Sequence, residues 1–113
     1  MLSVRVTVLV LLSGVLALSG SLTSVHAQEL TVTIKNHRFE PTELRVPAGK
    51  RVTIYVVNDD PTPEEFESVS MKVEKIIPGK SKGLVRVGPL TPGRYDFFGD
   101  FNQDTAKGVV IAE

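Results

Sequence analysis

Apolar and polar residues alternate with a period of two in residues 30–35. This period is typical of a β-strand that buries one face and exposes the other. The same alternation, or a short apolar run, predicts further strands at residues 43–46, 51–58, 64–68, 71–77, 81–87, 94–98 and 108–112. The chain is therefore predicted to form seven or eight short strands.

Residues that favour turns separate these predicted strands. Pro, Gly, Asn and Asp gather at residues 47–50, 58–63, 78–79 and 88–93. Pro fixes the backbone φ angle there, and Gly adopts turn conformations without a steric cost. Turns that recur about every 8–12 residues are typical of a sandwich or barrel. No long segment has a helical period with caps, and only a helical turn at 102–107 is expected. We expect an all-β fold, an antiparallel Greek-key β-sandwich or barrel.

The period of two also predicts which side chains form the core. Tyr95 and Phe97 share one face of their strand, whereas Asp96 is expected to face solvent. Met71 is expected to pack in the core. Phe98 and Phe101 do not both fit on that face, so one or both are expected at the loop end of the barrel, either as a docking spot or as a small cluster under the loop. The predicted core residues are Leu30, Val32, Ile34, Leu44, Val46, Val52, Ile54, Val56, Phe66, Tyr95, Phe97, Val109 and Ile111.

The start of the chain has the pattern of a secretory signal. Arg5 supplies a positive charge, residues 6–18 are almost wholly apolar, and small residues lead to a cleavage site after Ala27. An uncleaved membrane anchor is the alternative, but the apolar run is shorter than the roughly 20 residues that span a bilayer. We predict a signal peptide at 1–27 and one domain at 28–113, exported to the periplasm, with no membrane span after cleavage.

Composition excludes several classes of function. The 113 residues carry 13 basic and 13 acidic side chains, so the net charge is zero and a nucleic-acid partner is not expected. The chain has no cysteine, which excludes disulfides and cysteine-ligated metals. It has no Ser–His–Asp arrangement, phosphate loop or Gly-rich nucleotide motif, so a conventional enzyme finds no support.

Several motifs resemble those of the cupredoxins. Residues 39–41 followed by 46–50 resemble the second-strand signature of that family. Residues 88–97 resemble the G-x-Y-x-F strand that precedes the C-terminal ligand loop, and residues 108–111 resemble the last strand. The resemblance extends over residues 30–113 and implies a cupredoxin-like fold.

Two further segments indicate a particular subgroup of this family. Residues 62–68 and 97–108 are similar to small periplasmic cupredoxin-like proteins found beside high-affinity iron permeases. They are also similar to the cupredoxin-like domain of EfeO-type proteins. The resemblance therefore implies a role in handling metal for iron uptake.

The resemblance also implies that a type 1 copper site is missing. Such a site uses two histidines, a cysteine thiolate and usually a weak axial methionine. The family's cysteine corresponds to Gly99, its second histidine to Phe101 or Asn102, and its first to Glu64 or Glu65. All three strong ligands are absent, so the thiolate-to-copper charge transfer of blue copper proteins is excluded.

The loops that hold copper in the family are acidic in this chain, and carboxylates with an imidazole suit iron or copper. The Glu-aromatic-Glu pattern of the resembled proteins corresponds to Glu65 and Glu67, and Asp100 is the acid nearest the missing cysteine. His37 is the one imidazole left after cleavage. We therefore predict His37, Glu65, Glu67 and Asp100 as metal ligands.

Other interpretations of these residues stay open at this point. If Phe66 points into the core, Glu64 shares its face while Glu65 and Glu67 share the other, and Glu64 is the alternate ligand. His37 is equally interpreted as a turn residue. Acidic loop residues of a soluble protein are commonly a solvated rim.

The resemblance implies a periplasmic metal-binding protein of an iron-uptake system. It would bind a copper or iron ion and deliver iron to a membrane permease, with a periplasmic iron-binding protein as a further partner. Oxidation of ferrous iron would need a bound redox metal. The chain offers such a metal few nitrogen ligands and no thiolate, so we rank metal binding or delivery above catalysis. The alternative is a metal-free structural or protein-interaction module that retains the fold.

Overall fold

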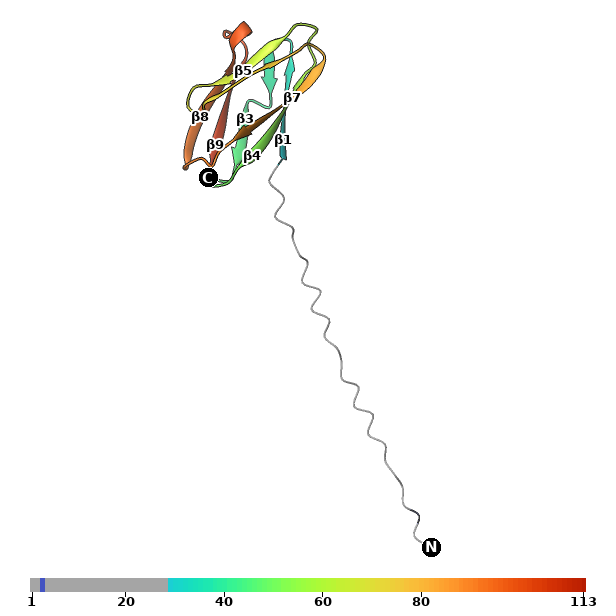
Figure 1. Ribbon diagram of the computed structural model, residues 1–113, viewed down its shortest axis with the longest axis vertical. Coiled ribbons are helices and arrows are strands. Elements are labelled where there is room, and N and C mark those ends of the chain that lie inside the picture. The colour runs from blue at the N-terminus through green and yellow to red at the C-terminus, as the bar shows by residue number, and fades with distance from the viewer. Residues whose placement is uncertain (1–2, 4–28) are drawn as a thin grey trace.

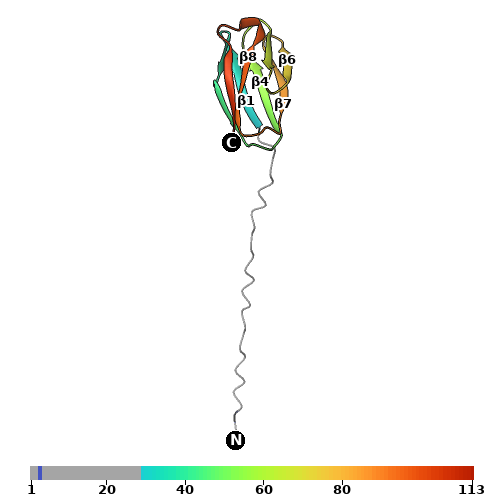
Figure 2. The same ribbon diagram turned by 90° about the vertical axis from the view of Figure 1, so that its left-hand side faces the viewer.

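The computed structural model describes Ser3 and residues 29–113; apart from Ser3, the predicted signal peptide lies outside the described residues. Within residues 29–113, nine strands pack as two facing sheets, with one short 3-10 helix at the end of the sandwich opposite the C-terminus (Figure 1, Figure 2). The strands are β1 Glu29–Lys35, β2 Arg38–Glu40, β3 Glu43–Val46, β4 Val52–Asn58, β5 Glu64–Ser68, β6 Val73–Ile77, β7 Ser81–Val87, β8 Gly93–Gly99 and β9 Lys107–Ala112, and the helix is η1 Asp100–Asn102.

The four-stranded sheet has the order β2-β1-β4-β7, and the five-stranded sheet has the order β3-β9-β8-β5-β6. The predicted all-β sandwich is confirmed, but the sheets are mixed, because β1 pairs with β4 and β3 pairs with β9 in parallel. Turn residues report only which strands are connected by short loops. They carry no information on pairs that form between distant segments, so these two parallel pairs were not predicted, whereas the other strand pairs are antiparallel as expected.

A tight hairpin joins β1 to the short strand β2, which the sequence did not predict. Asn36 and His37 form the turn with left-handed φ angles of 53° and 58°. The carboxylate of Asp60 accepts hydrogen bonds from the backbone N–H groups of both residues, at 2.8 Å and 2.9 Å. Because β2 has three residues and only Phe39 is buried, it is too short to show a period.

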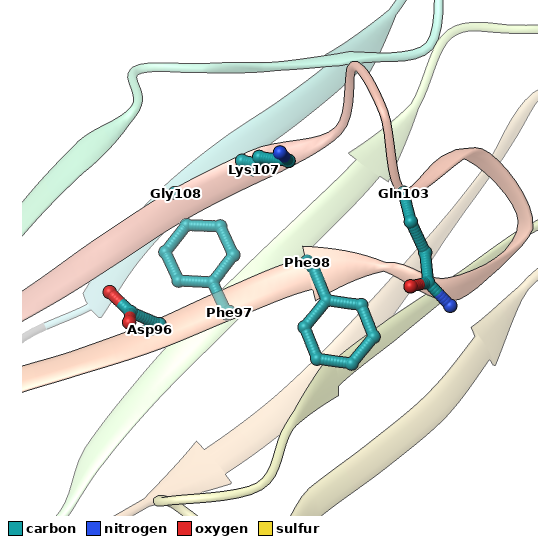
Figure 3. A pocket seen from close by; sticks show the side chains of 6 residues that line it. All are labelled: Asp96, Phe97, Phe98, Gln103, Lys107 and Gly108. Carbon is teal, nitrogen blue, oxygen red and sulfur yellow. The ribbon is translucent and has the colours of Figure 1, made fainter.

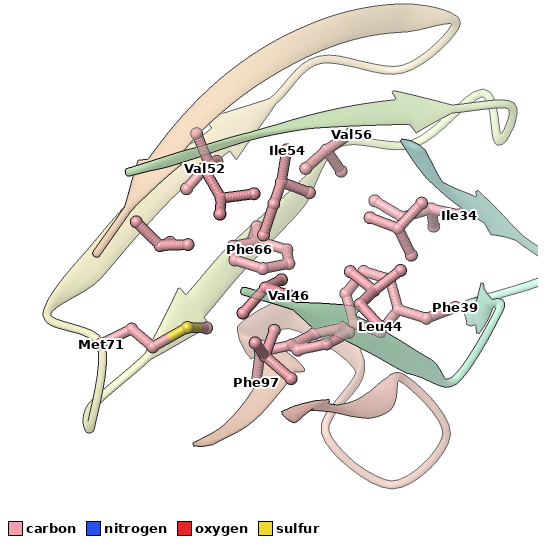
Figure 4. Close-up of a cluster of buried hydrophobic side chains, with 14 of the residues drawn as sticks. Ile34, Phe39, Leu44, Val46, Val52, Ile54, Val56, Phe66, Met71 and Phe97 are labelled. Atoms are coloured by element: carbon pink, nitrogen blue, oxygen red, sulfur yellow. The ribbon is translucent and has the colours of Figure 1, made fainter. Parts of the chain in front are cut away.

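Three phenylalanine rings form the centre of the core (Figure 4). Phe66 stacks on Phe97 with 4.9 Å between the ring centroids, and Phe39 meets both rings edge-on at 5.8 Å and 5.0 Å. The predicted core is confirmed in β1, β3, β4 and β5, except that Leu30 is only partly buried. Tyr95 also packs against the core while partly exposed.

The predicted orientation of the last strand was wrong. Val110 and Ala112 are buried, whereas Val109 and Ile111 are half-buried on the outer face. The register with β3 decides this orientation, because Val110 pairs with the buried Leu44. Since β9 is apolar on both faces, its alternation gave no indication of which face points inward.

The remaining expectations concern single side chains and the end of β8. Met71 is buried and Asp96 is exposed, as predicted. The helical turn predicted at 102–107 instead occupies Asp100–Asn102, directly after β8. In the part of the chain that the structure describes, no helix is long and apolar enough to cross a membrane.

Candidate metal-binding site

The alternation of β5 separates its three glutamates. Glu64 lies on the inner face with Phe66, and both side chains are at most 1% exposed. Glu65 and Glu67 lie on the outer face of the five-stranded sheet, as the period of two requires. Glu65 is nevertheless only 8% exposed, so its carboxyl group is largely removed from water.

The structure brings together three of the four predicted ligands. Carboxylate oxygens of Glu65, Glu67 and Asp100 all lie within 4.8 Å of one another, a spacing that suits a shared metal ion. Two of the residues come from β5, and Asp100 comes from η1. Glu74, which the sequence did not single out, lies opposite Glu67 in β6. We call Glu65, Glu67 and Asp100 the carboxylate cluster.

The electrostatics of the cluster are dominated by like charge. A hydrogen bond with Glu74, removal from water, and the negative charges of Glu74, Asp100 and Glu67 together raise the pKa of Glu65 to about 7. Within residues 29–113, the ion pairs join Arg45 to Glu43 and Glu113 and do not involve the cluster. A cation would relieve this repulsion.

His37, the fourth predicted ligand, lies outside the cluster. It is a turn residue whose carbonyl accepts a hydrogen bond from the Thr105 hydroxyl at 2.6 Å. Its Nε2 atom lies 3.4 Å from the Thr62 hydroxyl. His37 and Asp100 line one shallow hollow together, but the imidazole does not join the group of carboxylates.

Glu64, the alternate ligand, is committed to hydrogen bonds inside the protein. Its Oε1 atom accepts from the backbone N–H groups of Glu65 at 3.1 Å and of Phe101 at 2.9 Å. Its Oε2 atom accepts from the side-chain amide of Asn102 at 2.6 Å. These three donors come from two segments far apart in the chain, so the carboxylate ties β5 to η1.

The inner end of the sandwich does not fit a type 1 copper centre. A Cβ atom on Gly99, the position that corresponds to the family's cysteine, would lie 2.6 Å from the Glu64 carboxyl carbon and 2.7 Å from the Cβ of Ala106. Both separations are too short for non-bonded atoms. The space beside Gly99 is therefore filled, and the chain has no thiolate.

A shallow hollow of about 400 Å³ lies along β8 and β9 (Figure 3). Phe98, which pairs with Glu67 across the sheet, contributes half-buried apolar surface to it. Asp96, Gln103 and Lys107 supply its polar lining. Of the two aromatic residues expected near the loop, Phe101 is the exposed one, at 49%.

Sequence reasoning missed two members of this region. Glu74 faces the cluster only because of the pairing of β6 with β5, for which the sequence contains no signal. Asn102 was considered only as the position of a lost histidine, yet its amide binds Glu64. One signal for Asn102 was available in the sequence. If Glu64 points inward, its carboxyl group needs hydrogen-bond donors, since buried charged groups are paired or hydrogen-bonded.

A nine-stranded sandwich of two mixed sheets, with potential ligands at the end where β5 begins and β8 ends, defines a cupredoxin-like protein. The sequence pattern of the family described as "Cupredoxin-like domain" matches residues 7–112. The chain therefore belongs to this family.

One curated relative is an uncharacterized protein of Rickettsia prowazekii (strain Madrid E). It is 44% identical over 84 residues, which are 74% of this chain and 66% of the relative. The chain thus spans slightly less than two thirds of the length of that protein.

Solved structures share the fold at low sequence identity. Auracyanin A, a "blue" copper protein from Chloroflexus aurantiacus, matches with a TM-score of 0.66 and 15% identity over 76% of this chain and 98% of its own. Amicyanin from Paracoccus versutus matches with a TM-score of 0.61 and 21% identity over 80% of this chain and 86% of its own. A purple cupredoxin from Nitrosopumilus maritimus matches with a TM-score of 0.57 and 20% identity over 74% of this chain and 99% of its own. At these identities the likeness establishes the fold.

Proposed function

We propose that this chain is a metal-binding cupredoxin-like protein that holds an iron or copper ion at the carboxylate cluster. The observation that carries the proposal is the gathering of Glu65, Glu67 and Asp100 within 4.8 Å. Glu65 strengthens it, because a nearly buried carboxyl group faces like charges and, among residues 29–113, accepts no hydrogen bond from an N–H group.

The donor set indicates what kind of ion would bind. All three ligands are carboxylates, which are hard oxygen donors and suit hard or borderline cations. Metal binding requires deprotonated ligands, so a bound ion would displace the proton that Glu65 retains near neutral pH. The chemistry proposed is binding and delivery, with no redox step assigned to the chain.

The cellular role is the finer part of the proposal. The similarity of residues 62–68 and 97–108 to cupredoxin-like proteins found beside iron permeases supports delivery of iron to such a permease. A periplasmic iron-binding protein is the proposed second partner. The signal pattern of residues 1–27 supports export to the periplasm.

The test is a paired substitution, Glu65→Gln with Asp100→Asn, in the protein that starts at Gln28. It removes two charges from the cluster while nearly preserving shape. Calorimetry at pH 7 with Cu²⁺, and with Fe³⁺ held soluble by a weak chelator, is expected to show binding to the wild type and a loss of at least about tenfold in the double variant.

The matched control is Glu40→Gln with Asp59→Asn, which removes the same charge from exposed residues outside the cluster. It is expected to bind as the wild type does. Equal affinity of all three proteins would show that the cluster is a solvated rim, and the metal-free structural or interaction module would then be the better interpretation of the fold.

A further inference from the structure

We propose that Glu64 organises the inner end of the sandwich, where β5 meets η1, and is the positioning residue of the carboxylate cluster. Its carboxylate, rather than an ion, joins β5 to η1. Any metal that binds is then confined to the outer face of β5. The second part of this inference rests on the proposed function, and the first part does not.

The contacts of Glu64 make it an internal ligand for the loop. Its two oxygens accept three hydrogen bonds, from Glu65, Phe101 and Asn102, with donor–acceptor distances of 2.6–3.1 Å. With 1% of its side chain exposed, Glu64 contributes nothing to the surface, and a buried carboxyl group needs hydrogen-bond partners of this kind.

The position of Glu64 explains why no other group fits there. The space next to Gly99 is the one that a side chain at position 99 would enter, and the carboxyl group of Glu64 fills it. Glycine at position 99 is thus required by close approach and not by its backbone angles, since only Gly49, Gly88 and Gly93 have positive φ among the described glycines.

The same hydrogen bonds determine where Asp100 lies. The residue before it, Gly99, donates its N–H to the Ala106 carbonyl at 2.9 Å, and the residue after it, Phe101, donates to Glu64. Asp100 is therefore held by its backbone on both sides. The side chain of Gln103 donates to its Oδ1 atom at 2.7 Å, which orients the carboxylate.

Two substitutions separate positioning from mere stability. Glu64→Leu keeps much of the volume but removes every acceptor, so three donors lose their partner. Glu64→Gln keeps the oxygen that binds the two backbone N–H groups. The Asn102 amide can rotate so that its oxygen accepts from the new amide, because its only side-chain hydrogen bond in the described structure is to Glu64. The glutamine variant is the conservative rescue.

The experiment has two readouts on each protein. The first is hydrogen exchange of the Phe101 amide by NMR, which needs no metal. The second is the affinity for Cu²⁺ at pH 7. We expect Glu64→Leu to lose the protection of the Phe101 amide and to bind Cu²⁺ at least about tenfold more weakly, although no cluster carboxylate is altered. Glu64→Gln is expected to restore both to near the wild-type values.

Each outcome decides one part. If folded Glu64→Leu binds Cu²⁺ as the wild type does, positioning by Glu64 is overturned while the proposed function stands. If the wild type binds no metal, the proposed function fails. The organising role of Glu64 is then decided by the Phe101 amide alone: loss of its protection in Glu64→Leu supports that role, and retained protection overturns it. If Glu64→Leu does not fold, Asn102→Ala, which removes one donor at the half-buried end, is expected to give the same two changes to a smaller extent.

Discussion

Glu64 and Glu65 are consecutive residues of the same type, yet they meet opposite surroundings. Glu64 accepts hydrogen bonds from three donors. Glu65 instead faces Glu74, Asp100 and Glu67, whose negative charges raise its pKa. A single step along β5 therefore separates a carboxylate that is satisfied by the protein from one that still needs a proton or a cation.

The raised pKa of Glu65 predicts how the stability of the metal-free protein depends on pH. Its pKa is about 7 in the folded protein and 4.5 when unperturbed, so the folded state binds more protons between these values. Stability must then decrease as pH rises from 4.5 to about 7, and this contribution is lost above that range. Chemical denaturation across pH 4.5–8 is expected to show a shallower decrease in Glu65→Gln than in the wild type.

A cation provides the control for this pH dependence. If the carboxylate cluster binds metal, saturating Cu²⁺ is expected to stabilise the wild type above pH 7, where Glu65 is deprotonated, and to do little for Glu65→Gln. Parallel pH profiles of the two proteins without metal would contradict the electrostatic description of Glu65.

Phe97 is the residue whose loss we expect to cost most. It is 1% exposed and packs against the rings of both Phe39 and Phe66. Phe97→Ala leaves a cavity that these neighbours cannot fill and is expected to lower the free energy of unfolding by about 3–5 kcal/mol, measured in urea. Phe101→Ala, at an exposed aromatic, is the control and is expected to change it by less than about 0.5 kcal/mol. Equal effects of the two variants would contradict this description of the core.

At the scale of elements, β9 offers a direct comparison of two neighbouring valines. Val110 is fully buried and Val109 is half-buried on the outer face. Val110→Thr places a hydroxyl group in the core and is expected to cost about 1–3 kcal/mol in denaturant unfolding, whereas Val109→Thr is expected to be nearly neutral. Both variants keep a β-branched side chain, so strand propensity does not differ. The reverse order would show that the strand faces the other way.

The β1–β2 hairpin gives a second element to test. His37 adopts a left-handed conformation with φ of 58°, which glycine adopts without a steric cost. His37→Gly is expected to leave stability unchanged or raise it by up to about 1 kcal/mol, whereas Arg38→Gly, in strand β2, is expected to lower it. Because the imidazole lies outside the carboxylate cluster, the affinity of His37→Gly for Cu²⁺ is expected to equal that of the wild type.

These elements show what the sequence can and cannot indicate. Sequence patterns located every strand except β2. Most of these strands have one apolar face and one mixed or polar face, or are bounded by turn residues. Alternation failed for the face of β9 and for the short strand β2, where no alternation exists. Glu65, Glu67 and Asp100 were found through family resemblance, while Glu74 depends on strand register, which side-chain periodicity does not determine.

The whole molecule is predicted to lack the spectrum of a blue copper protein. The chain contains no thiolate, and Glu64 fills the space beside Gly99. Addition of Cu²⁺ is therefore expected to give at most the weak, broad absorption of copper bound by oxygen or nitrogen, measured by visible spectroscopy. An intense blue product would contradict both the assignment of the ligands and the filled interior.

The pairing of the two sheets has a consequence for the order in which the chain folds. β1 lies between β2 and β4, and β9 lies between β3 and β8, so both outermost segments of the described sequence are interior strands. The five-stranded sheet stays in two pieces until residues 107–112 are available, and pairings between distant segments form slowly. The domain is therefore unfinished until these residues have been synthesised. If the chain is exported as we propose, this late completion of the sheet would keep it in the unfolded state that a secretion channel accepts.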